Sequence, residues 1–63
     1  MKWYKYKEVL INLDRIYRLD IPSDDTGIVF SFSKNDWEFL NFTSEEERDA
    51  EYEKIKYLLG IED

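Results

Sequence analysis

The feature of this sequence that most restricts its fold is a helical pattern in the last third of the chain, with residues that mark both the start and the end of the helix. Ser44, with Glu47 three residues later, matches a capping box, and Gly60 is the kind of residue that ends a helix. Acidic residues fill the first turn, where the helix dipole favours negative charge. Apolar residues then recur on one helical face, at Tyr52, Ile55, Leu58 and Leu59. The pattern predicts one amphipathic helix over residues 45–59.

The rest of the chain shows the two-residue period of β-strands, interrupted by turn residues at 12–15, 22–27 and 34–36. We expect strands over about residues 3–13, 16–21, 28–33 and 37–42. One strand face, formed by Ile28, Phe30 and Phe32, is expected to meet Ile55 and Leu59. The predicted fold class is α+β, with a three- to four-stranded antiparallel β-meander and one C-terminal amphipathic helix packed on one face. Residues 1–63 are expected to form a single domain.

One helix cannot cover both faces of such a sheet. The chain has no cysteine with which to staple so small a fold, yet 17% of its residues are aromatic. Aromatic side chains that a monomer leaves exposed usually mark an interface. We therefore expect a homodimer, or a permanent partner, at an interface formed by Trp3, Tyr4, Tyr6, Tyr17, Trp37 and Phe39.

The net charge of −6 is unevenly distributed, because residues 1–18 are basic on balance and the remainder is strongly acidic. An acidic partner-binding face is predicted on the helix at Glu46, Asp49 and Glu53, where it would steer the domain toward a basic partner or mimic phosphate charge. The alternative is a solvated helix face, with contacts such as those of Glu51 with Lys54.

The residue types offer little for catalysis. The chain has no histidine and no cysteine, so a serine nucleophile would need a lysine as its base, and we predict that the chain is not an enzyme. Asp20, Asp24 and Asp25 cluster around one loop but do not follow the EF-hand pattern. They are expected to form a solvated turn, and no metal or cofactor is predicted.

Two alternative functions stay open from the sequence. A small, nucleotide-like ligand would bind at the dimer seam, in a pocket lined by aromatic residues with Arg15 and Arg18. Nucleic acid would contact residues 2–7, where lysines alternate with aromatic side chains that stack on bases. The acidic remainder of the chain opposes nucleic-acid binding, so an edge strand protected by lysines is the preferred interpretation of that segment.

The absence of cysteine fits a reducing compartment, and no signal-peptide pattern opens the chain. The longest apolar run, residues 9–11, is too short to span a bilayer. A cytoplasmic location without membrane association is predicted.

Residues 9–16, with the segments 42–47 and 53–59, resemble many small uncharacterised bacterial and phage proteins. In those proteins an Asn-x-Asp-x-Ile turn links the first two strands and one helix closes the sheet. The layout is also similar to a family of small flagellar regulators, although that family has a compact glycine-containing hairpin where this chain has residues 33–36. The resemblance implies an accessory or mobile-element product that binds something larger. The leading hypothesis is a non-enzymatic protein-interaction module that acts as a homodimer, of the kind that phages use to inhibit a host defence or regulatory protein.

Overall fold

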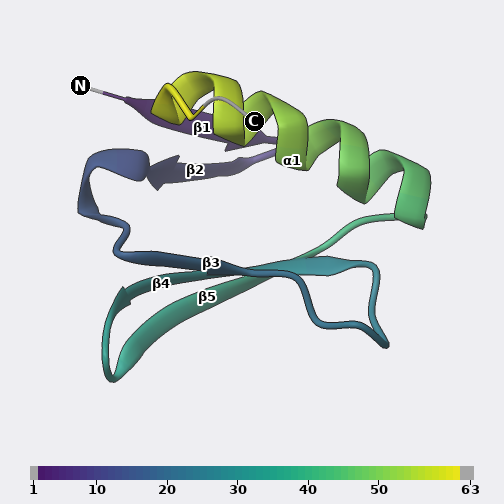
Figure 1. The fold of residues 1–63 in the computed structure, drawn as a ribbon, viewed down its shortest axis with the longest axis horizontal. Coiled ribbons are helices and arrows are strands. Elements are labelled where there is room, and N and C mark those ends of the chain that lie inside the picture. Colours follow the sequence, from purple (N-terminus) through teal and green to yellow (C-terminus); the bar gives the residue numbers. More distant parts are fainter. Residues whose placement is uncertain (1, 62–63) are drawn as a thin grey trace.

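The computed structural model describes residues 2–61, and within them the chain forms five strands and one α-helix (Figure 1). The strands make two antiparallel sheets, one with two strands and one with the order β3–β4–β5. The α+β class with a closing helix is confirmed. The elements are β1 (Trp3–Tyr6), β2 (Val9–Asn12), the 3₁₀ turn η1 (Leu13–Arg15), β3 (Arg18–Asp20), β4 (Gly27–Ser33), β5 (Asp36–Asn41) and α1 (Glu45–Leu59).

The single strand predicted over residues 3–13 is wrong, because this segment folds back on itself as the β1–β2 hairpin. Tyr6 pairs with Val9 across a two-residue turn at Lys7 and Glu8. Such turns need positive φ, which usually calls for glycine or asparagine. Here Lys7 adopts φ 54°, so the turn carries none of the residues that would have marked it in the sequence.

The turn expected at residues 12–15 is confirmed, and it delays the next strand. The Asn12 side chain accepts a hydrogen bond from the Asp14 N–H (3.0 Å), which stabilises η1. The Leu13 N–H donates to the Lys2 carbonyl oxygen (2.8 Å), so the hairpin is extended by one more backbone bond. Strand β3 consequently begins at Arg18 rather than at residue 16.

The helix and the hairpin lie on the same side of the three-stranded sheet, and the core fills the space between these two layers (Figure 1). The Tyr4 ring stacks on Phe30 with centroids 6.0 Å apart, and Tyr6 meets Phe42 edge-on at 4.6 Å. The expected packing of one β4 face against α1 is confirmed, with Phe32 and Leu59 at its margin. The buried residues are Tyr4, Ile11, Leu13, Ile28, Phe30, Leu40, Phe42 and Ile55.

Both ends of α1 are where the sequence predicts them. The Ser44 hydroxyl accepts a hydrogen bond from the Glu47 N–H (3.1 Å). At the other end Gly60 adopts φ 79°, its N–H donates to the Tyr57 oxygen (3.1 Å), and the Ile61 N–H donates to the Lys56 oxygen (3.0 Å). These two bonds form a Schellman motif, which satisfies carbonyl groups that a helix otherwise leaves unpaired.

The inner face of α1 is apolar only toward its C-terminus. Ile55 is fully buried, and Tyr52 and Leu59 pack against the core. Leu58 was expected on this face, but it is 37% exposed and does not belong to it. In the N-terminal half, polar residues take over the contact with the rest of the fold, and they shape the surfaces described next.

Candidate functional site

A row of tyrosine–glutamate hydrogen bonds joins β1 to α1. The Tyr4 hydroxyl donates to Glu51 Oε1 (2.7 Å), and the Tyr6 hydroxyl donates to Glu47 Oε1 (2.9 Å). Residues two apart on a strand are separated by about 6.8 Å, and residues four apart on a helix rise by about 6 Å. The two spacings match closely enough for both bonds to form side by side. We call these two pairs the tyrosine–glutamate seam.

The surroundings of the seam hold its protons in place. Burial, and then the hydrogen bond to Glu51, raises the pKa of Tyr4 far above its ordinary value. Desolvation, and then the bond to Glu47, raises the pKa of Tyr6 as well. Hydrogen bonds from the Thr43 N–H (2.8 Å) and from Tyr6 lower the pKa of Glu47. The two tyrosines therefore remain hydrogen-bond donors and Glu47 remains an acceptor near neutral pH. The seam thus holds β1 against α1.

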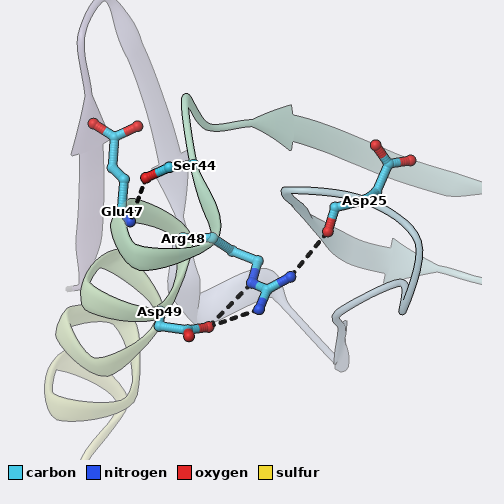
Figure 2. Close-up of polar contacts among 5 residues, drawn as sticks. All are labelled: Asp25, Ser44, Glu47, Arg48 and Asp49. Carbon is cyan, nitrogen blue, oxygen red and sulfur yellow. Dashed lines mark hydrogen bonds and ion pairs between the residues drawn. The ribbon is translucent and has the colours of Figure 1, made fainter.

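Arg48 ties the start of α1 to the loop between β3 and β4 (Figure 2). Its guanidinium donates to the Asp25 backbone oxygen (2.9 Å) and to Oδ1 of Asp49 (2.9 and 3.1 Å). Only 12% of the Arg48 side chain is exposed. We did not predict a role for Arg48 from the sequence. The one available signal was a cation close to a helix N-terminus, where the dipole disfavours positive charge unless a tertiary contact compensates.

The outer face of the three-stranded sheet carries two exposed aromatic side chains on β5. Trp37 is 60% exposed and Phe39 is 38% exposed. The Phe39 ring covers Gly27, where an added Cβ would overlap the ring and lie 2.7 Å from the Leu40 oxygen. Among the described residues, positive φ occurs at Lys7 and Gly60 and not at Gly27. Gly27 is instead required because the ring and the neighbouring strand leave no room for a side chain.

An open groove of about 530 Å³ runs along β2, between the hairpin and residues of β4 and β5. Trp3 and Leu10 line it on the hairpin side, and they are 47% and 62% exposed. Phe32, Asp36 and Glu38 line it on the sheet side. The groove therefore combines apolar surface, one strand edge and two carboxylates.

Comparisons with protein-family models, with curated proteins and with solved structures find no match to this chain. The resemblance to small bacterial and phage proteins, and to flagellar regulators, accordingly stays a prediction. What the chain does has to follow from its own surfaces.

The six aromatic residues of the predicted interface lie in different parts of the molecule. Tyr4 is 2% exposed and belongs to the core, so it is removed from the predicted interface. Tyr6 is half-buried and is engaged in the seam. Both point inward because β1 directs alternate side chains to opposite faces. Trp3 lies on the outer face of the hairpin, and only Trp37 and Phe39 share a surface.

Of the aromatic and arginine residues predicted to bind a ligand, Tyr17 and Arg18 line one pocket, and Arg15 lies elsewhere. Tyr17 is 60% exposed and lies near Leu59, at the C-terminal end of α1. Arg15 lines the groove along β2. Arg18 forms an exposed ion pair with Asp20 (2.8 Å), which raises its pKa. The two arginines therefore line different pockets within a single chain.

The predicted acidic face is present on the exposed side of α1. Glu46, Asp49 and Glu53 are all exposed and follow the i, i+3, i+7 spacing of one helical face. Asp49 is engaged with Arg48 and Glu53 with Lys56 (3.4 Å), so the face is partly neutralised. The contact expected between Glu51 and Lys54 is confirmed at 3.0 Å.

The basic and aromatic side chains of residues 2–7 do not share one surface, because side chains alternate between the two faces of β1. The two tyrosines turn toward the core and the seam, which leaves Trp3 as the aromatic side chain of this segment that bases could stack on. The Lys7 ammonium lies 5.4 Å from the centre of the Tyr6 ring. The stacking platform that would bind single-stranded nucleic acid is thereby reduced to one ring.

Within residues 2–61, no helix is long and apolar enough to cross a membrane. In the same part of the chain, Asp20, Asp24 and Asp25 do not join in a group that could hold a metal ion, and neither do other carboxylates. The surfaces that remain for a partner are the outer sheet face, the groove along β2 and the acidic face of α1.

Proposed function

We propose that this chain is a protein-interaction module that forms a homodimer through the outer face of the three-stranded sheet. The observation that carries the proposal is the exposure of Trp37 and Phe39 on a sheet face that neither α1 nor the hairpin covers (Figure 1). Aromatic anchors of this kind dominate the binding energy of protein interfaces once they are desolvated.

The outer face has a small apolar centre with a polar surround, as protein interfaces do. Two cross-strand rows make it up: Trp37, Ser31 and Arg18 in one, and Phe39, Val29 and Asp20 in the other. Arg18 and Asp20 form an ion pair with each other, so the face carries no net charge. Two copies of a chain with net charge −6 therefore meet here without placing like charges opposite one another.

The two ends of the face also complement each other. Lys34 lies in the turn that follows β4, whereas Asp24 and Asp25 lie in the loop that precedes it. Stacked sheets pack about 10 Å apart with their strands nearly aligned. When the strands of the two copies run antiparallel, each Lys34 approaches the acidic loop of the second copy. This is the self-complementary arrangement that a two-fold dimer requires.

The acidic helix stays accessible in such a dimer, because α1 lies on the other side of the sheet (Figure 1). Glu46, Asp49 and Glu53 then face solvent in both copies. The further partner that this surface fits is a larger protein with a basic patch, since complementary potentials speed and orient association.

Sedimentation equilibrium from about 10 µM to about 1 mM tests the dimer. We expect dimers in the wild-type chain, and a dimer dissociation constant at least about 30-fold higher for Trp37→Ala, because truncating an anchor costs about 2 kcal/mol or more. The matched control is Tyr57→Ala, which truncates an aromatic residue that is 84% exposed on α1. A wild-type monomer across the whole range, or an equal effect of both variants, would sink the proposal.

A further inference from the structure

A sheet edge invites another strand to pair with it unless something protects it, and three of the four edges in this fold are protected. Strand β1 carries Lys5 and lies against α1. Strand β3 carries the Arg18–Asp20 ion pair and is followed by Pro22. Strand β5 carries Asp36 and Glu38, and its pairing with β4 is irregular between Ser31 and Ser33.

Strand β2 has none of these protections. Its sequence, Val-Leu-Ile-Asn, is free of charge, and Val9 and Leu10 are 38% and 62% exposed. It pairs with β1 only. Antiparallel pairs alternate between bonded and non-bonded residues, and the Leu13–Lys2 bond places Ile11 with Tyr4 in a bonded pair. The backbone groups of Leu10 and Asn12 therefore point away from β1, into the groove.

The opposite wall of the groove indicates what the added strand carries. Asp36 and Glu38 line that wall, and neither has an ion-pair partner among residues 2–61. Arg15, at the end of β2, contributes the one positive charge of the lining. Two carboxylates against one guanidinium leave the groove with a net negative charge, which favours a segment with basic side chains on the face that meets β5.

We propose that the groove along β2 binds an extended basic segment of a partner protein, which adds to the hairpin as a third strand. Main-chain bonds to Leu10 and Asn12 hold the segment. Its basic side chains face Asp36 and Glu38, and its apolar side chains alternate with them toward Leu10 and Trp3. A second copy of this chain fits less well, because its own β2 offers no basic residue to the two carboxylates.

The inference rests on the proposed role in protein binding but not on dimerisation, and the test separates the two. In the Trp37→Ala variant, Trp3 is the sole tryptophan and lines the groove, so its fluorescence reports occupancy in a chain whose dimer interface is truncated. The probe is the blocked peptide acetyl-Lys-Val-Lys-Val-Lys-Val-amide, titrated to about 1 mM. We expect saturable binding that weakens as salt is added, because screening reduces the attraction between exposed charges.

Two variants, each made in the Trp37→Ala background, locate the binding. Leu10→Pro removes the outward N–H and spares the bonds between β1 and β2, whereas its control Leu10→Thr keeps that N–H. We expect binding at least about tenfold weaker for Leu10→Pro than for Leu10→Thr. Glu38→Lys, which does not touch the backbone, should weaken the lysine peptide and strengthen its glutamate counterpart, acetyl-Glu-Val-Glu-Val-Glu-Val-amide.

Each outcome decides the matter. If neither peptide binds saturably, or if binding is unaffected by both Leu10→Pro and Glu38→Lys, the proposal that the groove binds a strand is overturned. The proposed sheet-face dimer is not affected by that result. Sedimentation of otherwise wild-type chains gives the remaining outcome. A dimer that is lost in Leu10→Pro but kept in Trp37→Ala would show that β2 pairs with a second copy, which overturns both proposals. Peptide binding in a chain that sediments as a monomer supports the groove alone.

Discussion

The hydrogen bond from Tyr4 to Glu51 is predicted to contribute more to stability than the bond from Tyr6 to Glu47. Tyr4 is 2% exposed and the Glu51 side chain is 13% exposed, so the pair is well shielded from water. Apart from Tyr4, Glu51 has one partner among residues 2–61, Lys54. Glu47 also accepts the N–H and the hydroxyl of Thr43, so it keeps two bonds when Tyr6 is truncated.

Hydrogen bonds to charged groups are worth about 1.5–3 kcal/mol, and because Glu51 keeps Lys54 as a partner after the truncation, we place Tyr4→Phe near the lower end of that range. We expect a loss of about 1.5–2 kcal/mol for Tyr4→Phe and a smaller loss for Tyr6→Phe. The Phe ring keeps the stacking on Phe30, so the hydroxyl is the only group removed. For a chain of this size, a loss near 2 kcal/mol lowers the melting temperature by roughly 8–16 °C.

Urea unfolding of the wild type, Tyr4→Phe, Glu51→Gln and the double variant closes a double-mutant cycle. The cycle cancels the separate effect of Glu51→Gln on Lys54 and isolates the pair. We expect a coupling energy of about 1–1.5 kcal/mol. A coupling below about 0.5 kcal/mol, or a Tyr6→Phe loss as large as that of Tyr4→Phe, would refute the reasoning.

Three further predictions concern single positions. The pKa of Glu47 lies below its ordinary value of 4.5 in the folded chain, so its contribution is complete at neutral pH and is lost as the pH falls through the folded pKa. The deficit of Glu47→Gln in urea midpoint should therefore shrink from about pH 7 to about pH 3, and a constant deficit would contradict this. Gly60→Ala should cost about 1–2 kcal/mol in thermal melts, from its φ of 79° alone, since no atom lies within 4 Å of the added Cβ; an unchanged melt would be evidence against a conformational cost. Gly27→Ala should cost about 1–3 kcal/mol, and less in a Phe39→Ala background where the overlapping ring is absent; equal losses in both backgrounds would place the strain at the backbone instead.

The helix was predictable from the sequence because the signals that define it are local. Ser44 and Gly60 act within one turn of where they stand, and the bounds of α1 follow from them. The turn at Lys7 was not predictable by the same means, because a lysine at positive φ carries no turn signal of its own. Its positive φ is required by the two-residue turn that pairs Tyr6 with Val9, and without a turn signal one long strand was expected where two exist.

The division of the aromatic residues shows a second limit. Aromatic content correctly indicated more rings than one helix covers, and nine large apolar side chains are exposed among residues 2–61. Which rings are buried depends on the register of each strand, and the missed hairpin turn hid the register of β1. Tyr4 therefore belongs to the core while Trp3, one residue earlier, does not. Arg48 escaped for a related reason, since its partner in the β3–β4 loop is distant in sequence.

The tyrosine–glutamate seam depends on a fixed spacing between its two hydrogen bonds. Inserting one residue between Tyr4 and Tyr6 would place the two hydroxyls on opposite sides of the strand, so only one of them could still donate to α1. The turn at residues 7 and 8 follows both tyrosines in the chain and is exposed. An epitope or a reporter loop grafted there would lengthen the hairpin tip and leave the hydrogen bonds between β1 and α1 in place.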